Sequence, residues 1–166
     1  MLALQIEDIK QFMIQLFSEK TFDGFLLYEA KIHMSVSYVV DGSLNLDFFD
    51  QDEKELLENR SYARWDEQKQ IIFSMIRGKK TPADMQIILM QSPKNVESMM
   101  INHNIAYRPE DVRGLFLNIR FKDGKLICTT GVSLKTFTLD KSLEHLWEEM
   151  IVKYFKQKKI LSTRIQ

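Results

Sequence analysis

Alternating hydrophobic and polar positions divide the chain into predicted strands and helices. Between residues 25 and 39, apolar side chains alternate with mostly polar ones, which predicts a long strand with one apolar face. The apolar run MQIILM predicts a buried strand over about 85–90, and the acidic segment DQDEKELLENR predicts a short helix or a solvated turn. Apolar residues at helical spacing predict helices over about 6–18, 64–77 and 141–158, and a further helix that begins at Ser92-Pro93.

An Asp-Gly dipeptide at residues 41–42 predicts the first β-hairpin. With a three-residue loop at 40–42, Tyr38 faces Leu44, and the apolar side chains of both strands share one face. A two-residue turn would instead set Asn45 against the apolar face. Because the hydrophobic pattern sets strand register, we favour the longer loop.

A second Asp-Gly dipeptide, at residues 123–124, predicts a hairpin with a two-residue turn. This register pairs Ile119 with Cys128 and Leu117 with Thr130, which places Cys128 on the core face of the sheet. Burial among apolar side chains raises the pKa of a thiol and makes it a poor nucleophile. We therefore interpret Cys128 as a structural residue rather than as a catalytic nucleophile.

These elements predict a single α+β domain over residues 1–166. We expect an antiparallel sheet of about five strands, built on two β-hairpins, with the helices packed mainly on one face. If the strand over 25–39 lies at an edge of the sheet, it can pair with another chain. This favours a homodimer, and an unidentified protein partner is the other expectation.

Composition narrows the range of partners and compartments. The 23 basic residues balance the 23 acidic ones, which argues against nucleic acid as the main partner, because such binding rests on neutralising phosphates. A single cysteine forms no internal disulfide and suits a reducing cytosol. The sequence has no signal-peptide pattern, and no apolar run approaches the ~20 residues of a membrane span. We expect a cytoplasmic protein that does not bind membranes.

Thr130 and Gly131 mark the place where we would first look for a small-molecule pocket. The Thr130 hydroxyl needs a partner, which is either a backbone carbonyl or a group in a cavity. Gly131 inside a strand indicates a bulge or the close approach of another backbone. Trp65 and Tyr28 are further candidates, since an indole N–H and a phenol on the inner face of the sheet can line a cleft or simply pack in the core.

Lys79 lies in the segment GKKT at 78–81, which has the residue types of a phosphate-binding loop. The Walker pattern needs an earlier glycine, a preceding strand and a following helix. Here a helix precedes the segment and Pro82 follows it, so we interpret Gly78 as a helix cap. Lys79 is then a cation near a helix C-terminus and a weaker candidate for ligand binding.

The remaining motifs indicate no metal or cofactor. No two of the three histidines lie within five residues of each other, and no cysteine pair accompanies them. The acidic residues over 47–58 lack the central glycine of a calcium-binding loop. The G-x-S-x-G, H-E-x-x-H and G-x-G-x-x-G signatures are absent.

Several segments resemble an uncharacterised family of short proteins from anaerobic bacteria, a domain of unknown function. The resemblance spans nearly the whole chain. It rests on TFDGFLLYEA at 21–30, Asp41-Gly42, Trp65, IRGKKTP at 76–82, LNI at 117–119, TTG at 129–131 and DKSLEHLW at 140–147. It implies no reaction, ligand or catalytic residue.

Two hypotheses about function follow from the sequence. The first is a non-catalytic cytoplasmic binding or interaction module, for which a regulatory role is one expectation. It rests on the absence of a nucleophile–base or metal pattern in the sequence. The alternative is an enzyme or small-molecule binder with a pocket near Thr130, Gly131 and Trp65. Tyr28 and Lys79 complete the set of residues for that alternative.

Overall fold

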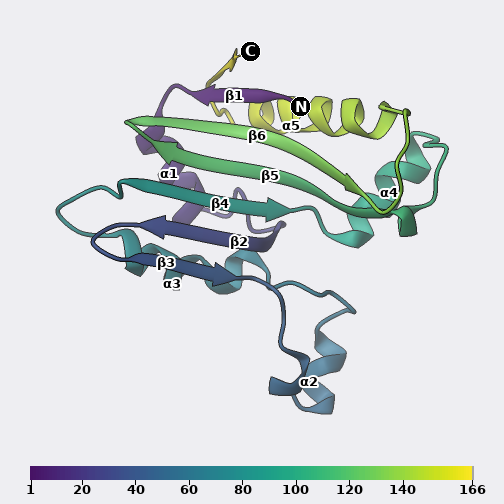
Figure 1. Ribbon diagram of the computed structural model, residues 1–166, viewed down its shortest axis with the longest axis horizontal. Helices are drawn as coiled ribbons and strands as arrows, with labels where there is room; N and C mark the ends of the chain where they lie inside the picture. The colour runs from purple at the N-terminus through teal and green to yellow at the C-terminus, as the bar shows by residue number, and fades with distance from the viewer. Residues whose placement is uncertain (166) are drawn as a thin grey trace.

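A seven-stranded antiparallel sheet organises the structure, a computed structural model that describes residues 1–165 (Figure 1). Within these residues the strands are β1 (Ala3–Ile6), β2 (Leu26–His33), β3 (Ser37–Asp41), β4 (Asp84–Met90), β5 (Val112–Lys122), β6 (Lys125–Leu134) and β7 (Ser162–Ile165). The α-helices are α1 (Ile9–Phe17), α2 (Gln51–Leu56), α3 (Trp65–Ile76), α4 (Pro93–Asn102) and α5 (Ser142–Gln157). Short 3₁₀ helices lie at Leu46–Phe48 and Pro109–Asp111.

The strand order is β3-β2-β4-β5-β6-β1-β7, and every neighbouring pair is antiparallel. This confirms the α+β class, but the prediction of about five strands is wrong. The two additional strands, β1 and β7, have four residues each and pair with one another. Such short strands carry too little alternation to be separated from a neighbouring helix pattern.

The first hairpin reverses earlier in the chain than the Asp-Gly dipeptide suggested. Strands β2 and β3 are joined at Met34–Val36, where the Met34 amide donates to the Val36 carbonyl at 2.9 Å. The long predicted strand is therefore two strands, and its second half, β3, forms the edge of the sheet. At Gly42 the backbone passes so close to β2 that an added Cβ would lie 1.8 Å from the Leu27 carbonyl oxygen. A close backbone approach, rather than a turn, explains this glycine.

The second hairpin has the register that the sequence predicted. Ile119 pairs with Cys128, and Leu117 pairs with Thr130. Asp123 and Gly124 form the two-residue turn, with φ angles of 53° and 73°. Positive φ at both turn residues matches the right-handed twist of the flanking strands.

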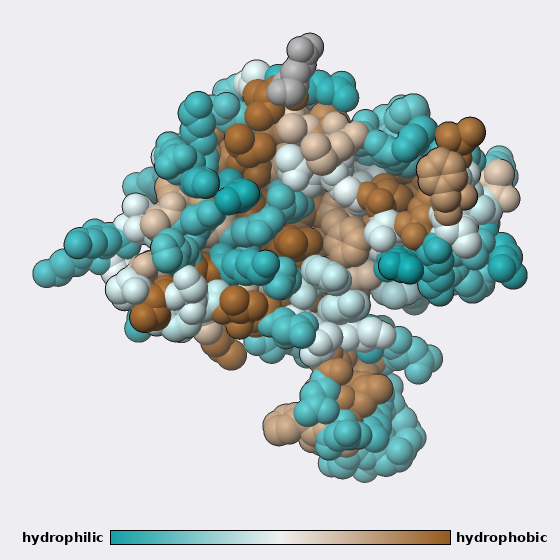
Figure 2. All heavy atoms as spheres, viewed as in Figure 1, coloured by the Kyte–Doolittle hydropathy of each residue, from teal (hydrophilic) through white to brown (hydrophobic). Residues whose placement is uncertain are grey.

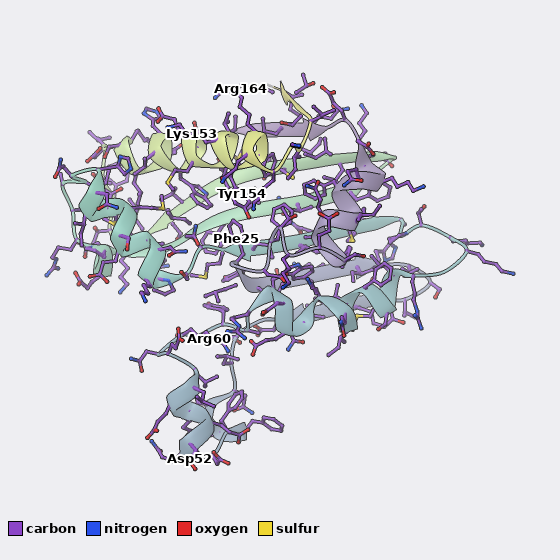
Figure 3. All side chains as sticks on the ribbon, turned by 180° about the vertical axis from the view of Figure 1, so that it is seen from behind. Phe25, Asp52, Arg60, Lys153, Tyr154 and Arg164 are labelled. Atoms are coloured by element: carbon purple, nitrogen blue, oxygen red, sulfur yellow. The ribbon has the colours of Figure 1, made fainter. Side chains whose placement is uncertain are left out.

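Helices α1, α3 and α5 lie behind the sheet in Figure 1 and in front of it in Figure 3. Two buried tryptophans fix helices to their neighbours. The Trp65 indole N–H donates to the Leu16 carbonyl at 2.8 Å, and the Trp147 indole N–H donates to the Phe116 carbonyl at 2.9 Å. Among the residues described, no helix combines the length and the apolar character needed to cross a membrane.

Residues 43–62 project from the sheet as a separate excursion, which we call the arm (Figures 1 and 3). It includes α2 at its tip, where Asp52 lies, and Arg60 near its root. The two ends of the arm are joined by a β-bridge between Ser43 and Tyr62 and by the Leu44 amide, which donates to the Ser61 carbonyl at 2.9 Å. These contacts hold the two ends of the arm together at the sheet.

Candidate functional site

Thr130 and Trp65 both lie on the helix-covered side of the sheet, and their polar groups are already bonded. The Thr130 hydroxyl accepts a hydrogen bond from the Leu2 amide at 3.0 Å, and Thr130 is only 4% exposed. Trp65 is fully buried and donates to the end of α1. Both side chains stabilise packing between elements rather than lining an open cleft.

Cys128 lies two residues before Thr130 on β6 and is fully buried on the same side of the sheet. Burial raises the pKa of this thiol far above its ordinary value, which keeps it protonated and unreactive. The predicted position of Cys128 on the core face of the sheet is confirmed.

Tyr28 and Gly131 lie on the opposite, outer side of the sheet and meet at Phe116. A β-bulge between Leu27 and Glu29 turns the Tyr28 ring outward, so its expected position on the inner face is wrong. The Tyr28 ring centroid lies 5.0 Å from that of Phe116 and 5.3 Å from that of Tyr62. Gly131 is the cross-strand partner of Phe116. This aromatic cluster of Tyr28, Tyr62 and Phe116 joins the outer face to the root of the arm.

A row of hydrogen-bonded polar side chains crosses the outer face from β4 to β6. The Gln86 side-chain amide donates to the Asn118 carbonyl oxygen at 3.0 Å. The Asn118 amide in turn donates to the Thr129 hydroxyl at 3.2 Å. All three side chains are half-buried, and together they form an ordered polar surface on the central strands.

An ion pair between Arg120 and Asp84 continues this surface toward the β5–β6 turn. The guanidinium donates to both carboxylate oxygens, at 3.3 and 2.9 Å. These hydrogen bonds hold the pKa of Asp84 below its ordinary value. Arg120 separates two hollows of about 290 and 460 Å³, the second of which is bordered by Lys122 and Lys125.

Lys79 lies apart from the other predicted residues, in the exposed loop between α3 and β4. In Figure 1 this loop and the β5–β6 turn both extend from the same end of the sheet. We call Arg77, Lys79, Lys80, Lys122 and Lys125 the basic end. The residues singled out from the sequence thus divide among the core, the outer face and the basic end.

His33 and Ser37 form a hydrogen-bonded pair that the sequence did not indicate. His33 Nδ1 lies 2.7 Å from Ser37 Oγ, on the border of the smaller hollow. A catalytic serine needs a base that a third group orients and a site that excludes water. Both residues are exposed, and both oxygens of the nearby Asp84 carboxylate are bonded to Arg120. The pair closes the end of a hairpin and lacks the surroundings of a nucleophile.

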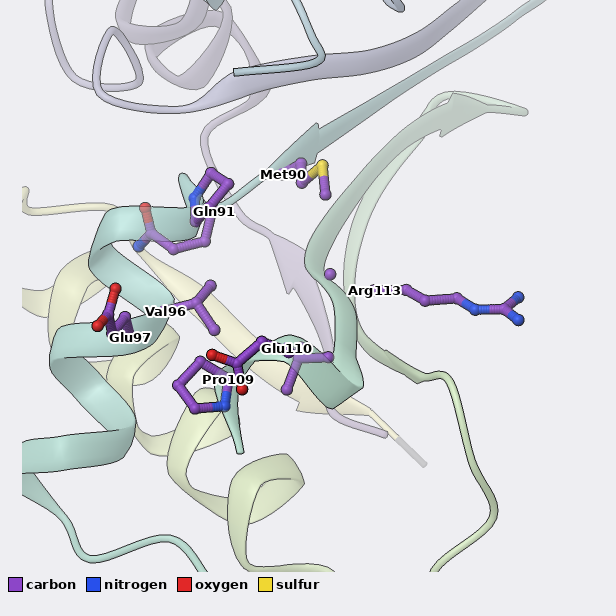
Figure 4. A pocket seen from close by; sticks show the side chains of 10 residues that line it. Met90, Gln91, Val96, Glu97, Pro109, Glu110 and Arg113 are labelled. Atoms are coloured by element: carbon purple, nitrogen blue, oxygen red, sulfur yellow. The ribbon is translucent and has the colours of Figure 1, made fainter. Parts of the chain in front are cut away.

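A smaller pocket of about 240 Å³ lies between α4 and the start of β5 (Figure 4). Met90 and Val96 supply apolar lining, and Glu97 and Glu110 supply carboxylates, whereas the Arg113 side chain extends away. Across residues 1–165, no group of three or more histidine, cysteine, aspartate or glutamate side chains is arranged to hold a metal ion. The pocket therefore offers a limited site with no catalytic constellation.

Figure 2 shows the outer face, on which hydrophilic and hydrophobic side chains alternate in small patches. Sequence reasoning missed its polar row because the members come from three strands separated by helices and turns. The available signal was the set of polar residues between the core positions of the second hairpin, which includes Asn118, Arg120 and Thr129. Identifying their neighbours on β4 requires knowledge of the strand order.

Comparison with known proteins places the chain in a family without assigning a function. No curated protein and no solved structure matches the chain. The model of a family of unknown function, DUF5721, matches residues 15–162. The chain belongs to this family of unknown function.

Proposed function

We propose that this protein is a non-catalytic binding module that uses the outer face of its sheet to bind a protein partner in the cytoplasm. The proposal assumes that the helices pack mainly on the other face of the sheet. Buried residues on the inner side of every central strand, such as Ile87, Leu117 and Cys128, support this arrangement. A binding module of this kind suits a regulatory role.

The single observation that carries the proposal is the hydrogen-bonded row of Gln86, Asn118 and Thr129 on a face that stays accessible. Side chains that are already ordered lose little conformational entropy when a partner binds. Tyr28, which contacts Phe116, and Arg120 lie on the same face, and tyrosine and arginine are among the residue types that contribute most to protein interfaces. The face therefore combines polar specificity with aromatic contact area.

A site-specific photo-crosslinking amino acid tests this proposal. Placed at Lys31, which is exposed on the outer face, it is expected to capture a discrete partner protein in cells. At Lys10, exposed on α1, the same group serves as the matched control and is expected to capture none. Adding Arg120→Glu to the Lys31 protein is expected to abolish capture without unfolding it. Equal capture at both positions, or none at the outer face, contradicts the proposal.

Acyl transfer at the His33–Ser37 pair is the second candidate, favoured only by the 2.7 Å contact. A fluorophosphonate probe, which reacts with activated serines, separates it from the binding proposal. We expect no labelling of the native protein. Stoichiometric labelling that disappears in Ser37→Ala would establish an activated nucleophile and favour the enzyme.

A further inference from the structure

The arm carries exposed apolar side chains in an acidic setting. Leu46, Phe48 and Leu56 are 52%, 81% and 79% exposed. Within residues 43–62 there are six acidic side chains and two basic ones, which gives the arm a net charge of −4. Exposed apolar groups that gather on a projecting segment mark an interaction surface. The arm is therefore a candidate ligand for another protein surface.

The exposed residues lie on an ordered scaffold. Asp50 and Glu53 form a reciprocal capping box at the start of α2, with hydrogen bonds of 3.0 and 2.8 Å. Leu57 is buried at the end of α2, and the Arg60 guanidinium donates to the Tyr62 carbonyl at 2.9 Å. A preorganised arm presents Phe48 and Leu56 without a large entropic cost of ordering on binding.

The basic end of the sheet is complementary in charge to the acidic arm. The hollow of about 460 Å³ is bordered by Arg120, Lys122 and Lys125, and Ile127 supplies apolar lining. Within residues 1–165 the ion pairs do not include Lys122 or Lys125. Asp123, between these lysines in the turn, is the acidic residue on this border. A hollow bordered by two lysines outside these ion pairs, with some apolar lining from Ile127, suits an acidic ligand that also carries apolar side chains.

We propose that the partner of the outer face is a second copy of this chain, whose arm lies against the basic end. This inference rests on the proposed function, because it names the protein that the outer face binds. In a two-fold symmetric dimer each arm contacts the basic end of the other copy, so the same contact is made twice.

Charge distribution is the reason for choosing a second copy over another acidic protein. The whole chain has a net charge of zero, although its arm is acidic and one end of its sheet is basic. The chain therefore supplies both halves of a complementary contact. Making the contact twice also doubles the buried area, which brings a short arm nearer to the ~1,200–2,000 Å² of a stable interface.

Charge reversal on each side of the contact provides the test, with the assembly state measured by sedimentation equilibrium. The wild-type chain is expected to reach twice its mass of 19.6 kDa at high concentration. Two arm reversals, Asp52→Lys and Glu55→Lys, leave the capping box intact. Two reversals at the basic end, Lys122→Glu and Lys125→Glu, flank the turn. Each pair is expected to raise the dimer dissociation constant on the order of tenfold or more.

The decisive measurement is made on a mixture of the two charge-reversed proteins. A basic arm then meets an acidic sheet end, and an acidic arm meets a basic one, so an equimolar mixture is expected to dimerise more tightly than either protein alone. Lys10→Glu with Lys153→Glu, exposed on α1 and α5, is the matched control and is expected to leave the dimer unchanged. Circular dichroism checks that every variant is folded.

The outcomes separate this inference from the function on which it rests. A wild-type chain that stays monomeric, or a dimer that the reversals do not weaken, overturns the inference. If such a chain still captures a different protein at Lys31, the binding function stands and only the identity of the partner is wrong. If nothing is captured at Lys31 and the chain is monomeric, both proposals fail.

Discussion

Thr130 and Leu2 are joined by two hydrogen bonds of 3.0 Å, one through the Thr130 hydroxyl and one through the Thr130 amide. The hydroxyl accepts from the buried Leu2 amide, so Thr130→Val leaves that amide without a partner. We expect Thr130→Val to lower the free energy of unfolding by about 1–3 kcal/mol. Urea unfolding followed by tryptophan fluorescence measures this loss.

Thr129→Val is the matched control for that substitution. The Thr129 hydroxyl bonds the Asn118 side chain on the half-exposed outer face, where water can replace it. We expect a loss below about 1 kcal/mol. Equal losses in the two variants would show that the Leu2 contact does not hold β1 in place.

Gly42→Ala is expected to be strongly destabilising. Its Cβ would lie 1.8 Å from the Leu27 carbonyl oxygen, so the two backbones must separate. Gly24→Ala is the control, because no atom lies within 4 Å of its added Cβ. Thermal unfolding should show a loss of several kcal/mol for Gly42→Ala, on the order of 4, and a change within about 1 for Gly24→Ala. Similar melting temperatures would contradict the close approach.

Cys128 is expected to give the protein a dependence on alkaline pH. Its pKa is raised in the folded state, so the unfolded thiol loses its proton first, at about pH 8.5. The stabilisation is therefore complete below that pH and is lost as the pH rises. The free energy of unfolding should fall by up to ~1.4 kcal/mol per pH unit between about pH 8.5 and 10.

Cys128→Ala removes the thiol and should flatten this part of the stability curve. Above about pH 10 the half-buried Tyr154, whose pKa is also raised by burial, adds a similar decline in both proteins. Urea unfolding at a series of pH values compares the two. A slope that is unchanged in Cys128→Ala assigns the pH dependence to other groups.

Asp84 offers a direct measure of the ion pair on the outer face. Hydrogen bonds from Arg120 lower its pKa, so Arg120→Gln should raise that pKa toward its ordinary value of about 3.9. Carboxyl chemical shifts in an NMR titration report this change residue by residue. The attraction of Lys122 remains in the variant, so a small depression of the pKa should persist. No change on substitution would mean that the ion pair is absent in solution.

The second hairpin and the larger helices were predictable because their information is local. Strict alternation on both sides of Asp123-Gly124 leaves a single register that buries Ile119 and Cys128 together. Ser92, where a helix was predicted to begin, is its N-cap, and its side chain accepts from the Asn95 amide at 3.3 Å. In such segments, side-chain pattern and backbone chemistry point to the same structure.

The first hairpin was mispredicted because the true reversal carries only a weak turn signal, a single serine at Ser35. Met34, Ser35 and Val36 contain no glycine, proline or asparagine, and the alternating pattern continues through them. Gly42 was taken as the turn, whereas its role is to let two backbones approach. The outer-face site was equally hidden, since Gln86 and Asn118 come together only after α4 and a 3₁₀ helix have returned the chain so that β5 pairs with β4.

Pairing between β1 and β6 also determines when this sheet can be finished. Leu4 pairs with Cys128, so two strands that lie far apart in the sequence are neighbours in the sheet. Contacts this far apart in sequence close slowly, because a long loop must be ordered before they form. During folding, Leu2, Leu4 and Ile6 therefore stay without most of their core contacts until this long loop has closed. The hydrogen bonds between β1 and β7 span a still longer stretch of chain, so we expect this edge of the sheet to form late in folding.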